Sequence, residues 1–178
     1  MSPGLPAGSP GDASPGNDTM TESGDKKPIV SRRKARKQAF EFLYGLSFEP
    51  AADERSLLRL FKRCPHDVAE GEDDAGHEFA WELVLGVWRN QRDIDAAIVR
   101  FSKNWKISRI AKVELTILRL AVHEILSRPD IPLRVSLNEA IELAKRYGDE
   151  NSRNFINGIL DAIAKAVDSG EFEIHKDL

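Results

Sequence analysis

The chain has 178 residues, of which 41% are hydrophobic and 31% are charged, and its formal net charge is −3 at pH 7. This composition suits a globular protein of one domain or two small halves, and it excludes a chain that is basic overall. No apolar run approaches the ~20 residues that a helix needs to cross a bilayer, and the N-terminus lacks the apolar core of an export signal. Since Cys64 is the only cysteine, no internal disulfide can form, and we expect a cytoplasmic protein without a membrane partner.

The first 28 residues predict a disordered tail. They hold five of the nine prolines and five of the twelve glycines, with no aromatic residue and no apolar period. Such a segment cannot bury enough surface to offset the entropy lost on ordering. We therefore expect a tail over residues 1–28 and one folded domain over residues 29–178.

A concentrated basic run opens the folded part. Residues 32–37 read RRKARK, so five cations stand together in a chain whose remainder carries −3 − 5 = −8. We expect a helix from about Ser31, acting as its N-cap, to about Phe48. Cations in the first turn oppose the helix dipole, and an anionic partner would reverse that effect.

One face of this helix carries two cations followed by two aromatic rings: Arg33, Lys37, Phe40 and Tyr44. Cationic groups for phosphates and a ring for a base suit single-stranded nucleic acid. A solvated basic terminus is the other interpretation, and the residues alone leave both open.

The remaining pattern predicts an all-α fold of six or seven helices. The expected segments are 53–64, 74–90, 93–101, 109–126, one that carries Leu137 to Tyr147 and ends at Gly148, and one that carries Phe155 to Val167. Residues 65–76 read as a polar loop. Because residues 109–126 are apolar nearly all round, we expect that helix at the centre of the fold.

No catalytic or metal-binding signature stands out. The four histidines form no i, i+4 pair, and no phosphate-binding glycine loop is present. Three charged residues on the apolar central helix, Glu114, Arg119 and Glu124, need partners, which either neighbouring helices or a functional surface would supply. Gly158 in mid-helix suggests close packing of another backbone against it.

Three segments resemble the NusB family of transcription antitermination proteins. They are RRKARKQAFEFLYG at 32–45, KVELTILRLAVHEIL at 112–126 and DIPLRVSLNEAIELAKRYGDENSRNFINGILDAIAK at 130–165. The resemblance covers about residues 31–165. It implies two perpendicular three-helix bundles, no enzymatic activity and no cofactor.

The same resemblance implies a partner set. Members of the family bind the boxA element of nascent RNA as a single strand, together with the small-subunit ribosomal protein NusE. The pair then works within the antitermination complex of RNA polymerase, above all on ribosomal RNA operons. A homodimer that hides the basic face stays open, and we expect the NusE surface in the C-terminal half, near Ser108 and the central helix.

The RNA-binding residues expected here come from both lines of reasoning. The resemblance places the main contact on the start of the first helix, aromatic contacts at Tyr44 and Phe155, and polar ones at Glu114 and Asn151; the helical face adds Lys37. The cations of the first helix are Arg32, Arg33, Lys34, Arg36 and Lys37. Without the resemblance, Phe155 would be assigned to the core.

Two other functions stay open at this point. The chain could be a helical protein–protein adaptor without RNA specificity, its basic run binding an acidic surface. It could also be an RNA-guiding module like the one fused to RNA methyltransferases, although no cofactor-binding α/β domain is apparent.

Overall fold

The computed structural model describes residues 29–64, 75–103 and 105–172, and these ranges contain helices and no strand. The predicted all-α fold is confirmed. The helices are α1 (Ile29–Leu46), α2 (Glu54–Arg63), α3 (Ala75–Arg89), α4 (Gln91–Phe101), the short 3-10 helix η1 (Ile107–Arg109), α5 (Lys112–Ser127), α6 (Leu133–Tyr147) and α7 (Glu150–Asp168). The predicted tail, and residues 65–74 of the predicted loop, lie outside the described residues.

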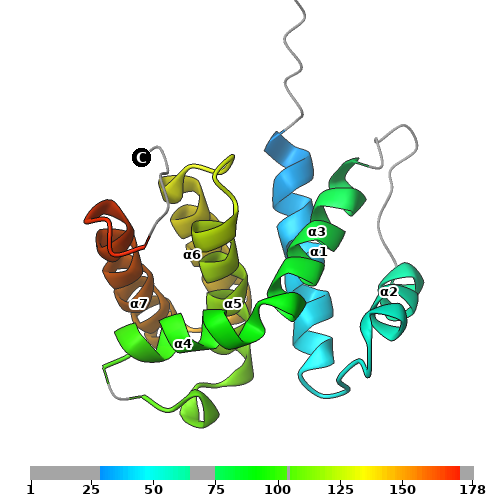
Figure 1. Cartoon of the computed structure of the whole chain (residues 1–178), viewed down its shortest axis with the longest axis horizontal. Helices are drawn as coiled ribbons and strands as arrows, with labels where there is room; N and C mark the ends of the chain where they lie inside the picture. Colours follow the sequence, from blue (N-terminus) through cyan, green and yellow to red (C-terminus); the bar gives the residue numbers. More distant parts are fainter. Residues whose placement is uncertain (1–28, 65–74, 104, 173–178) are drawn as a thin grey trace, which may run out of the picture.

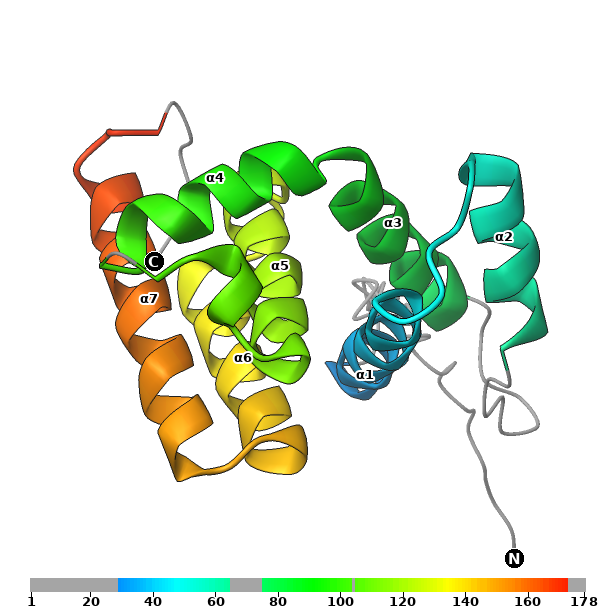
Figure 2. The same cartoon turned by 90° about the horizontal axis from the view of Figure 1, so that it is seen from below.

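The helices form two groups, which Figures 1 and 2 show side by side. Helices α1, α2 and α3 make the N-terminal bundle, and α5, α6 and α7 make the C-terminal one. Helix α4 continues from α3 and crosses the C-terminal bundle against α5 and α7. Helix α5 contacts α1, α3, α4, α6 and α7, so the expected central position of this segment is confirmed.

Helix α2 packs on its bundle through two buried side chains, Leu57 and Phe61. The ring of Phe61 is almost fully buried, and its centroid lies 5.1 Å from that of Phe42 on α1 and 5.3 Å from that of Trp81 on α3. At the start of α2, the carboxylate of Asp53 accepts a hydrogen bond of 2.7 Å from the backbone N–H of Ser56. Asp53 thus caps the helix expected from residue 53, and the expected helix end at Gly148 is confirmed.

Two details of the sequence prediction are wrong. Helix α1 begins at Ile29, so Ser31 lies inside its first turn and is not its N-cap. Most of the basic run consequently lies past the first turn, where the dipole argument loses its force because the effect fades within one turn. Gly158 does not receive another backbone, since a Cβ placed there would meet nothing within 4 Å.

Among the described residues, no helix is long and apolar enough to cross a membrane.

Candidate nucleic-acid interface

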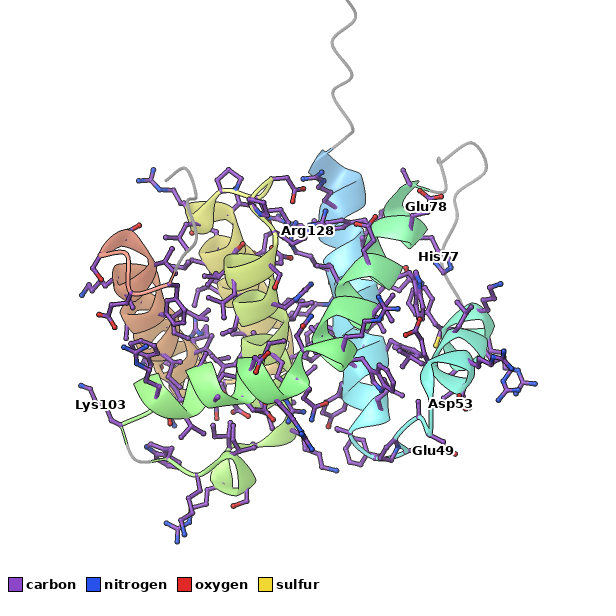
Figure 3. The ribbon with its side chains drawn as sticks, viewed as in Figure 1. Glu49, Asp53, His77, Glu78, Lys103 and Arg128 are labelled. Atoms are coloured by element: carbon purple, nitrogen blue, oxygen red, sulfur yellow. The ribbon has the colours of Figure 1, made fainter. Side chains whose placement is uncertain are left out.

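The basic run occupies the N-terminal half of α1. Arg33 and Lys34 are exposed, while Arg32 and Lys37 are half-buried. Their helix stands beside α3 and faces the α5–α6 end of the C-terminal bundle, where Figure 3 labels Arg128.

Three of these cations already contact acidic side chains. Arg33 donates to Glu139 on α6, with Nη2 2.8 Å from Oε1, and this hydrogen bond holds the pKa of Arg33 above its ordinary value. Lys37 lies 3.7 Å from Glu41, one turn along α1. In each pair at least one partner is exposed to solvent, so each pair contributes at most about 1 kcal/mol to stability. Phosphate oxygens could therefore replace these carboxylates at small cost.

Arg32 is the third of these cations, and it lies near a carboxylate without donating a hydrogen bond to it. Its Nη2 lies 3.7 Å from Oδ2 of Asp130, beyond hydrogen-bond distance. That carboxylate is engaged mainly by Arg128, whose Nε donates to it at 2.9 Å and keeps the pKa of Asp130 below its ordinary value. Arg32 consequently shares an acidic partner that is already neutralised.

Arg36 differs from its neighbours because it is only 4% exposed. Its Nε lies 2.6 Å from Oε1 of Glu124 on α5, and Nη2 donates to Oε2 at 3.2 Å. Glu124 is itself buried and also accepts a hydrogen bond of 3.0 Å from Ser136 on α6. The structure therefore places Arg36 between the two bundles, and its guanidinium does not face solvent as the basic-run prediction assumed.

The remaining expected residues gather at the opposite end of α1. Tyr44 follows Arg32 by twelve residues, which corresponds to about 18 Å along a helix. Its ring stacks with that of Phe40, at a centroid distance of 6.0 Å, and meets the edge of Phe48 at 5.2 Å. Phe48 is 61% exposed, so an aromatic edge faces solvent at this end.

Lys112 connects this aromatic pair to α5. Its Nζ lies 3.6 Å from the centroid of the Phe48 ring and donates to the backbone oxygen of Ser47 at 2.9 Å. Phe48 and Lys112 were not among the predicted residues. The i, i+4 spacing of Tyr44 and Phe48 could have indicated the first, whereas no local pattern indicates a contact across 64 residues.

Glu114 and Asn151 lie in the first turns of α5 and α7. Ser152 donates its hydroxyl hydrogen to Glu114 at 2.5 Å, which joins these two turns. The carboxylate of Asp149 caps α7 by accepting from the backbone N–H of Ser152, and this hydrogen bond lowers the pKa of Asp149. Asn151 stands exposed beside that cap.

Phe155 completes the group one turn further along α7. It is half-buried, and its ring meets the edge of Trp105 at a centroid distance of 5.6 Å. Trp105 is 50% exposed, so this pair also presents an aromatic surface to solvent. Four of the predicted residues, Tyr44, Glu114, Asn151 and Phe155, are thus assembled from α1, α5 and α7 at one end of the molecule.

Within the described ranges, no three His, Cys, Asp or Glu side chains gather closely enough to hold a metal ion. A pocket of about 340 Å³ opens between α1, α3, α4 and α5, and its walls are largely apolar, including Leu43, Val87 and Trp88. Burial raises the pKa of the Cys64 thiol, which disfavours a nucleophilic thiolate.

The family model described as "NusB family" matches residues 33–165 of this chain. The chain belongs to the NusB family. All the expected RNA-binding residues except Arg32 fall inside the matched range.

Similar proteins agree with this assignment. The transcription antitermination protein NusB of Nitratidesulfovibrio vulgaris (strain DP4) is 50% identical over 147 residues, which covers 83% of this chain and 96% of the relative. A solved structure of NusB from T. maritima has 39% identity and a TM-score of 0.64, and it covers 75% of this chain and 90% of its own. A structure of the antitermination factors NusB and NusE in complex with dsRNA has 28% identity and a TM-score of 0.61. The match covers 78% of this chain and 99% of the matched chain.

Proposed function

We propose that this chain is a transcription antitermination factor that binds boxA RNA as a single strand together with the ribosomal protein NusE. It acts by binding rather than by catalysis, in the cytoplasm, as part of an antitermination complex with RNA polymerase. Residues 29–172 supply the binding domain. Membership of the NusB family and a relative solved with NusE and dsRNA support this proposal.

The observation that best supports the proposal is the pair of aromatic contacts at the end of the molecule where α1, α5 and α7 meet. Tyr44 and Phe155 come from segments more than a hundred residues apart, yet both lie beside a second, more exposed ring. Partly exposed rings next to cations are the usual platform for single-stranded bases, since every base has a face that can stack. Exposed Asn151 lies nearby and can hydrogen-bond a base edge.

The cations of α1 supply the phosphate contacts in this proposal. Arg33 and Lys34 are exposed, and Arg32 and Lys37 are half-buried, so four side chains can reach an RNA backbone. Arg36 is left out of the contact set because its guanidinium is buried against Glu124. Four neutralised phosphates give a slope of about −3 for log affinity against log salt on a single strand.

The adaptor without RNA specificity is the second candidate, and one observation favours it. Arg33 already pairs with an acidic side chain in this structure, which shows that the basic run accepts carboxylates. An acidic protein surface could therefore replace RNA as the partner of α1.

The experiment is titration of a fluorescent boxA-like single strand, with and without NusE, across a range of salt. Wild type should bind more tightly with NusE and show the steep slope. Arg33→Ala should weaken binding several-fold and make the slope shallower by about 0.7.

Arg55→Ala is the matched control, because it removes one exposed arginine from α2, away from the proposed surface. This variant should leave the affinity for RNA and the salt slope unchanged. NusE binding without any preference for RNA would overturn the proposal and favour the adaptor.

A further inference from the structure

A second basic segment precedes α5, close to Ser108 where the NusE surface was expected, and none of the RNA-binding residues named above comes from it. Between Asp95 and Glu114 the chain contains no acidic residue and five basic ones, Arg100, Lys103, Lys106, Arg109 and Lys112. The last four follow one another at intervals of three, and all four are exposed. Figure 3 shows Lys103 projecting outward at the edge of the C-terminal bundle.

The local backbone brings two of these cations close together. Lys106 is the N-cap of η1, with an extended backbone, and Arg109 is its last residue. The backbone N–H of Arg109 donates to the carbonyl oxygen of Lys106 at 2.9 Å, which closes a single turn between them. Lys106 and Arg109 therefore present two exposed positive charges from the same turn.

Three of the five cations in this segment differ from those of the α1 run, because no carboxylate of the described residues neutralises them. Within the part of the chain that the structure describes, Lys103, Lys106 and Arg109 have no carboxylate within 4.0 Å, whereas Arg33 and Arg36 both do. A phosphate that binds Arg33 must displace Glu139, but one that binds Lys106 or Arg109 displaces only water and counterions. The release of those counterions is what drives binding to nucleic acid.

An aromatic side chain stands within the same segment. Trp105, at 50% exposure, directly precedes Lys106, and the edge-to-face contact with Phe155 fixes its position at the start of α7. Trp105 and Phe48 are the two exposed large aromatic side chains of the described residues. Both border the α5–α7 end, so the segment continues the aromatic surface assigned above.

We propose that Trp105, Lys106 and Arg109 form a second contact strip for single-stranded RNA, which extends the surface of Tyr44 and Phe155 along η1. This inference rests on the proposed function, because the ligand is the same strand. Trp105 stacks on a base, and Lys106 and Arg109 bind the adjoining phosphates. The strip gives the protein RNA contacts that do not compete with its own carboxylates.

The test compares the variant Lys106→Ala/Arg109→Ala with wild type in the salt titration of the boxA-like strand. Two lost phosphate contacts should make the slope shallower by about 1.4. The variant Arg55→Ala/Lys62→Ala removes two exposed cations from α2 and should leave the slope unchanged. Trp105→Ala should weaken RNA binding roughly fivefold or more, with little change in the salt slope.

Folding is monitored by circular dichroism and urea unfolding of each variant. Because Trp105 also packs on Phe155, Trp105→Phe serves as a second variant that keeps a ring at this position and should retain most of the affinity. Equal losses in Trp105→Phe and Trp105→Ala would argue against stacking on a base.

The outcomes separate this inference from the proposed function. If wild type shows no preference for RNA, the proposed function fails and the strip fails with it. If Arg33→Ala weakens RNA binding while Lys106→Ala/Arg109→Ala behaves like its control, only the strip is wrong. If the double variant loses NusE binding and keeps its affinity for RNA, the segment is a protein-binding surface and the inference is overturned.

Discussion

Arg36 on α1 and Glu124 on α5 form a buried ion pair between the two bundles, with Nε of Arg36 2.6 Å from Oε1 of Glu124. Ser136 on α6 adds a hydrogen bond of 3.0 Å to the same carboxylate. The pair thus joins three helices. It fixes the position of the part of α1 that carries the exposed cations Arg33 and Lys34. The basic run consequently has two roles, since one of its arginines positions the helix that presents the others.

Arg36→Ala should destabilise the fold strongly, because it leaves the Glu124 carboxylate buried without its guanidinium. Removal of one partner of a buried pair costs about 3–5 kcal/mol. The free energy of unfolding in urea measures this. Arg33→Ala, which removes an exposed cation from the same helix, should cost less than about 1 kcal/mol. Equal costs in the two variants would show that the buried pair has no special structural role.

Glu139→Gln should raise the affinity for RNA, since this carboxylate holds Arg33 at 2.8 Å in the free protein. An exposed pair of this kind is worth up to about 1 kcal/mol, so affinity should rise by at most roughly fivefold. The control is Glu54→Gln, which removes the same charge from α2, where the carboxylate accepts from Arg89 on α3 at 2.8 Å instead. If both variants raise the affinity equally, only the net charge matters.

Much of the fold follows from helical periodicity, whereas the site depends on contacts that periodicity does not encode. The apolar pattern of residues 109–126 indicates the central helix, and Asp53 and Gly148 mark helix ends. The burial of Arg36 also has a local signal, because it lies four residues before Phe40 and seven before Leu43, which are both buried. Its partner Glu124 is 88 residues away, and no sequence spacing reveals it.

The resemblance to a family located Phe155, which the residues alone would have assigned to the core. The structure supports both a packing role and a surface role, because Phe155 is half-buried and also lies against exposed Trp105. Helical periodicity indicates that one side of a residue packs inward. It does not indicate which residue from another segment lies against the other side.

Gly86→Ala should destabilise the protein, although alanine is the better helix former. A Cβ at Gly86 on α3 would lie 2.1 Å from Nε2 of His123, whose ring is buried on α5 and has little room to move. Overpacking of this kind costs about 1–3 kcal/mol. The matched control is Gly158→Ala on α7, which meets nothing within 4 Å and should stabilise by about 0.5–1 kcal/mol. Thermal unfolding of both variants tests the contrast, and a stabilised Gly86→Ala would contradict the close approach of α3 and α5.

Tyr147 should make stability fall as the pH rises in the alkaline range. Burial, together with the hydrogen bond that its hydroxyl donates to Glu41 at 2.5 Å, raises the pKa of Tyr147 to about 12. An unfolded tyrosine titrates near pH 10, so the folded state favours the neutral phenol. This contribution is fully present below about pH 10 and is lost as the pH rises toward 12.

Tyr147→Phe removes the titrating group while keeping the ring that packs on Phe40 at 4.4 Å. Urea unfolding of wild type and variant across this pH range should show a gap that narrows as the pH rises, because only wild type loses the contribution of the neutral phenol. The gap at neutral pH should be about 1 kcal/mol, the usual net worth of one hydrogen bond. A gap that stays constant with pH would mean that Tyr147 ionises equally easily in the folded and unfolded chain.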